Sequence, residues 1–126
     1  MKNVLLVDDD IFFVREITTG LDPKKFTIMS AKDGVEGLKL LETFTPDIIL
    51  LDINMPNMNG IEFLKKTNEK FGRGKIPTLI TSNLDGIDQI SEGVSLGIRG
   101  YIVKSSESIS SLELAIEGAL RKNLSA

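Results

Sequence analysis

The chain has 126 residues and a formal net charge of -3, and it contains neither cysteine nor histidine. That length suits one domain with a single hydrophobic core, so we expect residues 1–126 to form one unit. The missing residue types exclude disulfides and the usual zinc and iron sites, and the scattered basic residues exclude the footprint of a nucleic-acid binder.

The apolar runs are too short for a membrane segment. None approaches the roughly 20 residues that span a bilayer, and Met1-Lys2-Asn3 leads directly into a strand-like run rather than a signal peptide. We therefore expect a cytoplasmic protein with no membrane insertion.

Short apolar runs alternate with longer segments of helical period, which indicates repeated βα units and an α/β fold with a parallel sheet covered on both faces. In chain order we predict a strand near 3–8, a helix near 11–21, a strand near 26–30, a helix near 34–44, a strand near 47–52, a helix near 60–71, a strand near 77–82, a helix near 86–97, a strand near 100–103 and a helix near 109–123. Ser110 and Glu113 are predicted to form a capping box at the start of the last helix.

Every strand predicted to be buried delivers polar side chains at its C-terminal end. The first strand ends in Asp8-Asp9-Asp10, the third in Asp52, the fourth in Ser82 and the fifth in Lys104. In an open parallel sheet these ends lie along one edge, where such folds place their ligand sites. We therefore expect three carboxylates, a hydroxyl and an ammonium to converge there.

Asp8, Asp9 and Asp52 would lie close together if the first and third strands are neighbours. Crowded carboxylates cannot all stay ionised without compensation, and a divalent cation such as Mg²⁺, which shares its ligand positions with phosphate oxygens, would supply it. An aspartate beside such a metal can attack phosphorus to form an acyl phosphate. Lys104 could neutralise the phosphoryl oxygens, and Ser82 could donate a hydrogen bond to one of them.

Each of these residues also has a structural interpretation. Asp8 to Asp10 could simply cap the first helix, because aspartate is favoured at N-caps and in first turns. Taken singly, Asp52, Ser82 and Lys104 are also more often structural or solvated residues than functional ones. The combined pattern is what favours a site. The phenylalanines, from Phe12 onward, occupy periodic apolar positions and are expected to pack mostly in the core.

Five segments together resemble the receiver domain of two-component response regulators. They are Leu5–Asp10, Pro46–Pro56, Met58–Gly60, Pro77–Ser82 and Gly100–Lys104. The resemblance covers essentially the whole chain. Because no output domain follows, we expect a single-domain regulator of the chemotaxis type or an isolated receiver.

The resemblance implies a five-stranded, flavodoxin-like sheet and a role for each site residue. It implies Asp52 as phosphoacceptor and Asp9 as a direct Mg²⁺ ligand, with Asp8 acting largely through metal-bound water. The Asn54 main-chain carbonyl would be a further metal ligand, and Lys104 would pair with the phosphate. Ser82 and Tyr101 would be the switch residues.

The resemblance also implies partners. The phosphoryl group would come from a sensor histidine kinase or a histidine phosphotransfer protein, and phosphorylation would change affinity for a downstream protein that the sequence does not identify. The protein would be a monomer or a weak, phosphorylation-dependent dimer. It would not be an enzyme beyond catalysing its own phosphotransfer and dephosphorylation.

Two positions depart from the family pattern. Ser105 follows Lys104 where the family usually has proline, often after a cis peptide, and a cis bond before serine costs about 2.5–4 kcal/mol. We therefore predict a trans Lys104–Ser105 peptide. Ile98 stands where the family mostly has alanine, which predicts altered packing near the fifth strand.

Two other functions fit parts of the pattern. A phosphatase of haloacid-dehalogenase type also uses an aspartate at a strand end with Mg²⁺, but it needs a second aspartate at the position of Asn54. A flavodoxin-like cofactor binder shares the predicted topology. Its phosphate loop should be rich in serine, threonine and glycine, whereas Asp8-Asp9-Asp10 would repel a phosphate unless a metal intervened.

Overall fold

Strands and helices alternate along the chain in the computed structural model, which describes residues 1–55, 57–83, 87–106 and 108–121. The elements are β1 (Lys2–Val7), α1 (Ile11–Gly20), β2 (Phe26–Ala31), α2 (Gly34–Leu40), β3 (Ile48–Asp52), α3 (Gly60–Phe71), β4 (Thr78–Ser82), α4 (Ile87–Ser95), β5 (Gly100–Val103), a short 3-10 turn at Lys104–Ser106, and α5 (Ile109–Arg121). The predicted α/β class and the order of its elements are confirmed.

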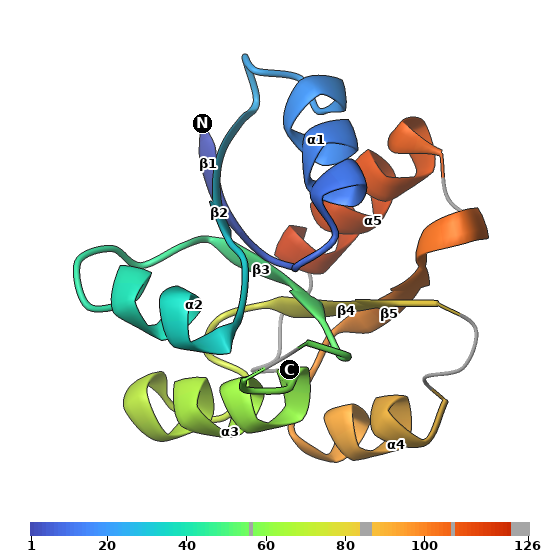
Figure 1. The fold of residues 1–126 in the computed structure, drawn as a ribbon. Helices are drawn as coiled ribbons and strands as arrows, with labels where there is room; N and C mark the ends of the chain where they lie inside the picture. The colour runs from blue at the N-terminus through green and yellow to red at the C-terminus, as the bar shows by residue number, and fades with distance from the viewer. Residues whose placement is uncertain (56, 84–86, 107, 122–126) are drawn as a thin grey trace.

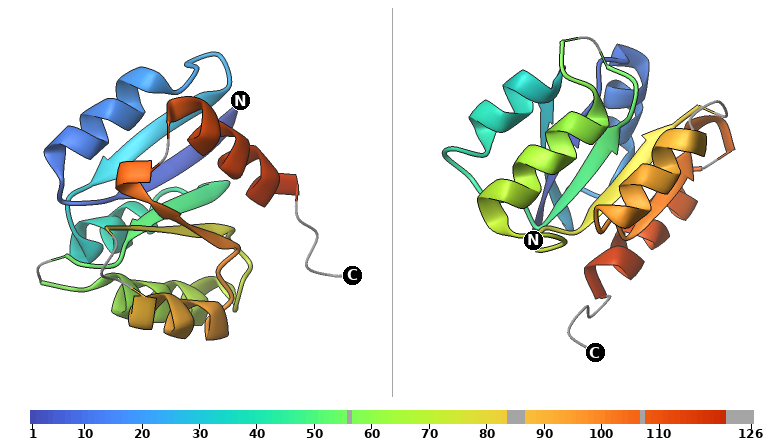
Figure 2. Two further views of the ribbon diagram at one scale, coloured as in Figure 1. Left: turned by 90° about the vertical axis from the view of Figure 1, so that its right-hand side faces the viewer. Right: turned by 90° about the horizontal axis from the view of Figure 1, so that it is seen from below.

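All five strands form one parallel sheet in the order β2-β1-β3-β4-β5. Helices α1 and α5 cover one face, and α2, α3 and α4 cover the other (Figures 1 and 2). The strand order reverses between β1 and β3, and open α/β sheets bind ligands beyond the carboxyl ends of the strands at such a point. The topology therefore predicts a ligand site at the residues that follow β1 and β3.

The central strands are apolar on both faces because helices cover both. Val4 and Leu6 pack on the side of α1 and α5, whereas Leu5 and Val7 pack on the side of α2 and α3, and all four are fully buried. This explains why β1 is a continuous apolar run rather than an alternating one. The core thus holds β1 and β3 rigidly side by side.

The first helices begin at side-chain caps. Asp10 accepts hydrogen bonds from the main-chain N–H groups of Phe12 (3.0 Å) and Phe13 (3.3 Å) at the start of α1. Asp33 caps α2 and Asn59 caps α3 in the same way. These caps satisfy N–H groups that have no partner inside the helix.

The predicted capping box at α5 is wrong. The helix begins at Ile109, and Ser108 is the residue whose hydroxyl accepts from the Ser111 N–H (3.1 Å). Glu113 instead accepts from the Asp22 N–H and pairs with Lys25. Several serines precede this helix, so the local pattern alone does not distinguish the cap from its neighbours.

Some other expectations need adjustment. Helix α2 ends at Leu40 rather than near residue 44, and the predicted starts and ends at 86 and 122–123 lie outside the described residues. Phe12 is not a core residue, since its side chain is 79% exposed. The buried side of α1 carries Phe13 and Ile17, four residues apart, and Phe12 falls off that stripe. None of the described helices is long and apolar enough to cross a membrane.

Candidate functional site

Three carboxylates meet at the carboxyl edge of the sheet. Asp8 and Asp9 directly follow β1 and Asp52 ends β3, and the pairing of Val7 with Leu51 places these strand ends side by side. One carboxylate oxygen from each residue lies within 4.8 Å of those from the other two. Asp8 and Asp52 are buried and Asp9 is exposed. Oxygen donors grouped in this way are the ligands that a hard divalent cation such as Mg²⁺ prefers.

The three consecutive aspartates do different things. Asp10 alone caps α1, so the structural interpretation of this run holds for one residue of the three. One oxygen of Asp8 accepts from the Asp10 N–H (2.9 Å), which holds the buried carboxylate in place. Asp9 takes no part in capping and presents its carboxylate beside the other two. The turn into α1 thereby aims two carboxylates at Asp52.

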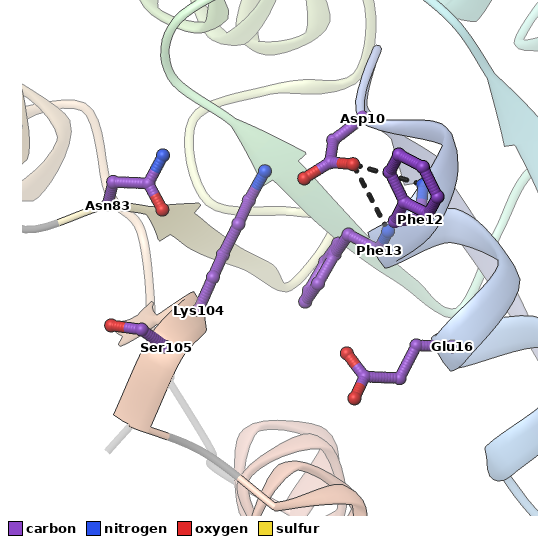
Figure 3. Close-up of a pocket in the computed structure, with 7 residues that line it drawn as sticks. All are labelled: Asp10, Phe12, Phe13, Glu16, Asn83, Lys104 and Ser105. Carbon is purple, nitrogen blue, oxygen red and sulfur yellow. Dashed lines mark hydrogen bonds between the residues drawn. The ribbon is translucent and has the colours of Figure 1, made fainter.

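Lys104 brings an ammonium to the two buried carboxylates. Its Nζ lies 2.8 Å from Asp8 Oδ2 and 3.7 Å from Asp52 Oδ2, and its side chain is 9% exposed. Figure 3 shows Lys104 extending across a pocket of about 400 Å³ whose other lining residues are Asp10, Phe12, Phe13, Glu16, Asn83 and Ser105. Lys104 thus lines this pocket while its ammonium contacts the two buried carboxylates.

Phe13 belongs to this site as well as to the core, a role that the sequence interpretation missed. Lys104 Nζ lies 4.8 Å from the centroid of the Phe13 ring. An ammonium over an aromatic face is attracted by the ring quadrupole, so Phe13 steadies the lysine without adding a charge. The signal in the sequence was the position of Phe13 in the first turn after the acidic run.

Burial raises the pKa of both inner carboxyls. Burial, together with the neighbouring Asp8 carboxylate, raises the pKa of Asp52 to about 7, although Lys104 opposes the shift. Burial also raises the pKa of Asp8, against the opposing effect of its contact with Lys104. One ammonium does not compensate two buried carboxylates, and a divalent cation would favour their ionised forms.

Two buried hydroxyls end β4. The Oγ atoms of Thr81 and Ser82 have no hydrogen-bond partner within the described part of the chain. Thr81 pairs in register with Asp52, and Ser82 pairs with Val103 on β5. A buried donor without a partner costs about 1–3 kcal/mol, so these hydroxyls can gain free energy when an acceptor arrives. Thr81 was not among the predicted site residues, because only the last residue of the strand was considered.

The remaining predicted residues flank the cluster. The Asn54 N–H donates to Asp52 Oδ1 (3.3 Å), so the loop after β3 begins against the carboxylate. Tyr101 lies on β5 with its side chain 56% exposed, outside the acidic cluster. The Lys104–Ser105 peptide is trans, as predicted.

The family model of the response regulator receiver domain matches residues 4–117. The chain therefore belongs to the receiver domains of response regulators, the phosphorylation-activated switches of two-component systems. Receiver domains take phosphoryl groups from histidine kinases and act on downstream effectors. This membership favours a receiver over the phosphatase and the cofactor binder considered above.

The curated relatives that are similar to this chain are longer proteins, and the similarity covers only part of each. The nitrate/nitrite response regulator protein NarL of Escherichia coli is 35% identical over 107 residues, covering 82% of this chain and 48% of NarL. The protein-glutamate methylesterase/protein-glutamine glutaminase 2 of Nitratidesulfovibrio vulgaris is 32% identical over 128 residues, covering 98% of this chain and 34% of that protein. The chain thus spans between a third and a half of the length of these relatives.

Solved structures agree with the fold. The chemotaxis protein CheY4 of Vibrio cholerae is 28% identical with a TM-score of 0.85, over 94% of this chain and 98% of that one. The receiver domain of the Francisella response regulator 1452 is 30% identical with a TM-score of 0.83, over 96% and 98% of the two chains. Both are similar in fold across nearly their whole length.

Proposed function

We propose that this chain accepts a phosphoryl group on Asp52 in a reaction that needs Mg²⁺, and that the product alters its affinity for a downstream protein. One observation carries the proposal. Carboxylate oxygens of Asp8, Asp9 and Asp52 lie within 4.8 Å of one another, with the Lys104 ammonium against the two buried ones. An acidic cluster with one cation at its side fits phosphoryl transfer, in which a metal and a lysine share the charge of the phosphoryl oxygens.

The acidic residues fit a bound Mg²⁺. Asp9 and Asp52 would hold it directly, Asp8 largely through metal-bound water, and the Asn54 carbonyl would complete the protein ligands. When bound, Mg²⁺ would neutralise charge that develops on the transferring phosphoryl group. The buried Asp8 carboxylate is held in place for this role, because one oxygen accepts from the Asp10 N–H (2.9 Å) and the other lies 2.8 Å from the Lys104 ammonium.

Asp52 would be the nucleophile. Its carboxylate oxygen forms a new P–O bond while the P–N bond of a phosphohistidine breaks, and the imidazole that leaves takes up a proton. Lys104, 3.7 Å from Asp52 Oδ2, would move onto a phosphoryl oxygen. Ser82 would donate its unpartnered hydroxyl to another phosphoryl oxygen.

The donor would be a sensor histidine kinase or a histidine phosphotransfer protein. Residues 1–126 would act as one receiver domain, monomeric or weakly dimeric when phosphorylated. The chain would catalyse only its own phosphotransfer and dephosphorylation. Ser82 and Tyr101, on neighbouring strands, would carry the change to the face formed by α4, β5 and α5.

Intact-mass measurement after incubation with Mg²⁺ and a small acyl phosphate tests the acceptor. We expect one added phosphoryl group in the wild-type protein, none in Asp52→Asn, and none when Mg²⁺ is chelated. Asp47→Asn is the matched control, since Asp47 precedes the same strand at its opposite end and bonds to the Asn3 N–H. Labelling of Asp52→Asn at the wild-type level would place the acceptor elsewhere.

A further inference from the structure

The start of α2 is tied to the loop that follows β3. Asp33 caps α2 with one carboxylate oxygen, Oδ1, which accepts from the Glu36 N–H (2.8 Å). Its other oxygen, Oδ2, accepts from the side-chain amide of Asn57 (3.0 Å). Asp33 is buried, and both bonds lower its pKa, so the carboxylate is ionised and both of its oxygens are engaged. A single side chain thus joins two segments that are 24 residues apart.

Asn57 occupies a backbone conformation that suits glycine better. Its φ is +69°, and it is the one non-glycine residue with positive φ in the described ranges. Asparagine tolerates this region more readily than most residues, but glycine meets no steric cost there. The side-chain bond to Asp33 is therefore a physical reason for asparagine at this position.

Further contacts hold the same loop. The Gly60 N–H donates to the Ile53 carbonyl (2.8 Å) and closes the base of the loop. Met58 packs directly on Gly34, where an added Cβ would lie only 2.9 Å from its sulfur. Asn54 begins the loop and donates to Asp52 Oδ1. The Asp33–Asn57 bond is thus one of the contacts that hold the segment behind Asp52.

We propose that Asp33 and Asn57 are positioning residues whose hydrogen bond holds the loop after β3 in place and thereby sets the affinity of the acidic site for Mg²⁺. The inference rests on the proposed function, because it assumes that Asn54 and Asp52 face the metal. A loop that is already ordered does not lose conformational freedom when the ion binds, and such preorganisation strengthens binding. Neither residue needs to touch the ion.

The Asn57→Gly variant distinguishes a role of the side-chain hydrogen bond in Mg²⁺ binding from a role of the backbone conformation alone. Glycine accepts the positive φ but removes the amide, so a merely structural role predicts unchanged Mg²⁺ affinity and equal or greater stability. The proposal predicts that the Mg²⁺ dissociation constant, measured by calorimetric or NMR titration, rises about 5- to 10-fold, the equivalent of one side-chain hydrogen bond. It also predicts faster amide hydrogen exchange at Asn54 without Mg²⁺.

Exchanging the two side chains tests the bond itself. Asn57→Asp should lose the hydrogen bond, because two carboxylates then face each other. Asp33→Asn alone can keep it, because an amide donates as well as accepts and the Asn57 amide can turn to accept from position 33. The double variant restores the pair with donor and acceptor reversed, and asparagine still caps α2. We expect its Mg²⁺ dissociation constant and its Asn54 exchange rate to return to within about twofold of wild type, as a double-mutant cycle requires for coupled residues.

Glu36→Gln is the matched control. Glu36 accepts from the Lys32 N–H at the same helix start, and among the described residues its side chain makes no hydrogen bond to the loop. Its replacement should therefore leave the Mg²⁺ affinity and the Asn54 exchange rate unchanged. Equal Mg²⁺ affinity in wild type and Asn57→Gly, or a double variant no better than Asn57→Asp, would overturn the positioning role. Absence of Mg²⁺ binding by the wild-type protein would instead overturn the proposed function and the claim about affinity with it.

Discussion

At Asp52, burial and ionisation oppose each other. The side chain is 8% exposed, and Asp8, also buried, shares the Lys104 ammonium with it. Its raised pKa means that the folded protein binds a proton at Asp52 more tightly than the unfolded chain does. The free energy that a protonated Asp52 contributes to folding is fully present below pH 4 and is lost as the pH rises through about 7.

Asp52→Asn should therefore stabilise the metal-free protein at high pH. Asparagine has a similar shape and carries no charge, so the variant avoids the cost of burying an ionised carboxylate. A shift of this size corresponds to about 4 kcal/mol at most. We expect a higher free energy of unfolding in urea than wild type at pH 8, with the difference shrinking toward pH 5. A variant less stable than wild type at pH 8, with Asp47→Asn unchanged, would contradict this electrostatic account.

At the scale of elements, β4 and β5 connect the acidic site to an exposed face. Ser82 pairs with Val103, and Tyr101 pairs with Ile80, so the two proposed switch residues lie on adjacent strands two residues apart in register. Gly93 on α4 packs beneath this region, where an added Cβ would lie 2.5 Å from Ile80 and 3.2 Å from Ile98. Both isoleucines thus pack against a glycine of the neighbouring helix.

Phosphorylation should perturb Tyr101 through Ser82. A phosphoryl group adds charge and acceptors near the Ser82 hydroxyl, which has no hydrogen-bond partner among the described residues. A small movement of β4 can then bias the packing of β5. Tyr101 is the only tyrosine and the chain has no tryptophan, so its ring resonances and fluorescence report on this face. We expect a change on phosphorylation in the wild-type protein that is lost in Ser82→Ala, while Asp52 is still labelled.

Ser91→Ala, which removes an exposed hydroxyl from α4, is the control for this measurement. It should leave the Tyr101 response intact. The coupling through β4 and β5 would be wrong if the Tyr101 signal does not change on phosphorylation. It would also be wrong if the signal changes equally in Ser82→Ala.

For the whole molecule, Mg²⁺ should act as a stabilising ligand. An ion that binds only the folded chain raises the free energy of unfolding by about 2.7 kcal/mol at a hundred times its dissociation constant. We expect a rise in melting temperature with Mg²⁺ in the wild-type protein and a much smaller one in Asp9→Ala. Asp10→Asn removes one charge from the same run but keeps the α1 cap, so it should respond like wild type. An undiminished response in Asp9→Ala would place the metal elsewhere.

The layers of this molecule, and the residues that could meet at its edge, follow from the local sequence pattern. Continuous apolar runs specify buried parallel strands, since both faces need cover, and the residues after those runs had to share one edge. This is why the sequence alone predicts that Asp52, Lys104 and Ser82 lie at the same edge of the sheet. Local pattern suffices here because each conclusion depends only on neighbours along the chain.

The roles of several similar residues, in contrast, depend on contacts that form only in the folded chain. Asp10 caps α1 while Asp8 turns inward to Lys104, and Ser108 rather than Ser110 caps α5. Asp33 and Asn57 meet across 24 residues. Pairs of this kind depend on strand register and on packing between distant segments. Neighbouring residues of the same type cannot be distinguished by their local sequence. Their roles are therefore known only from the contacts that each makes in the folded chain.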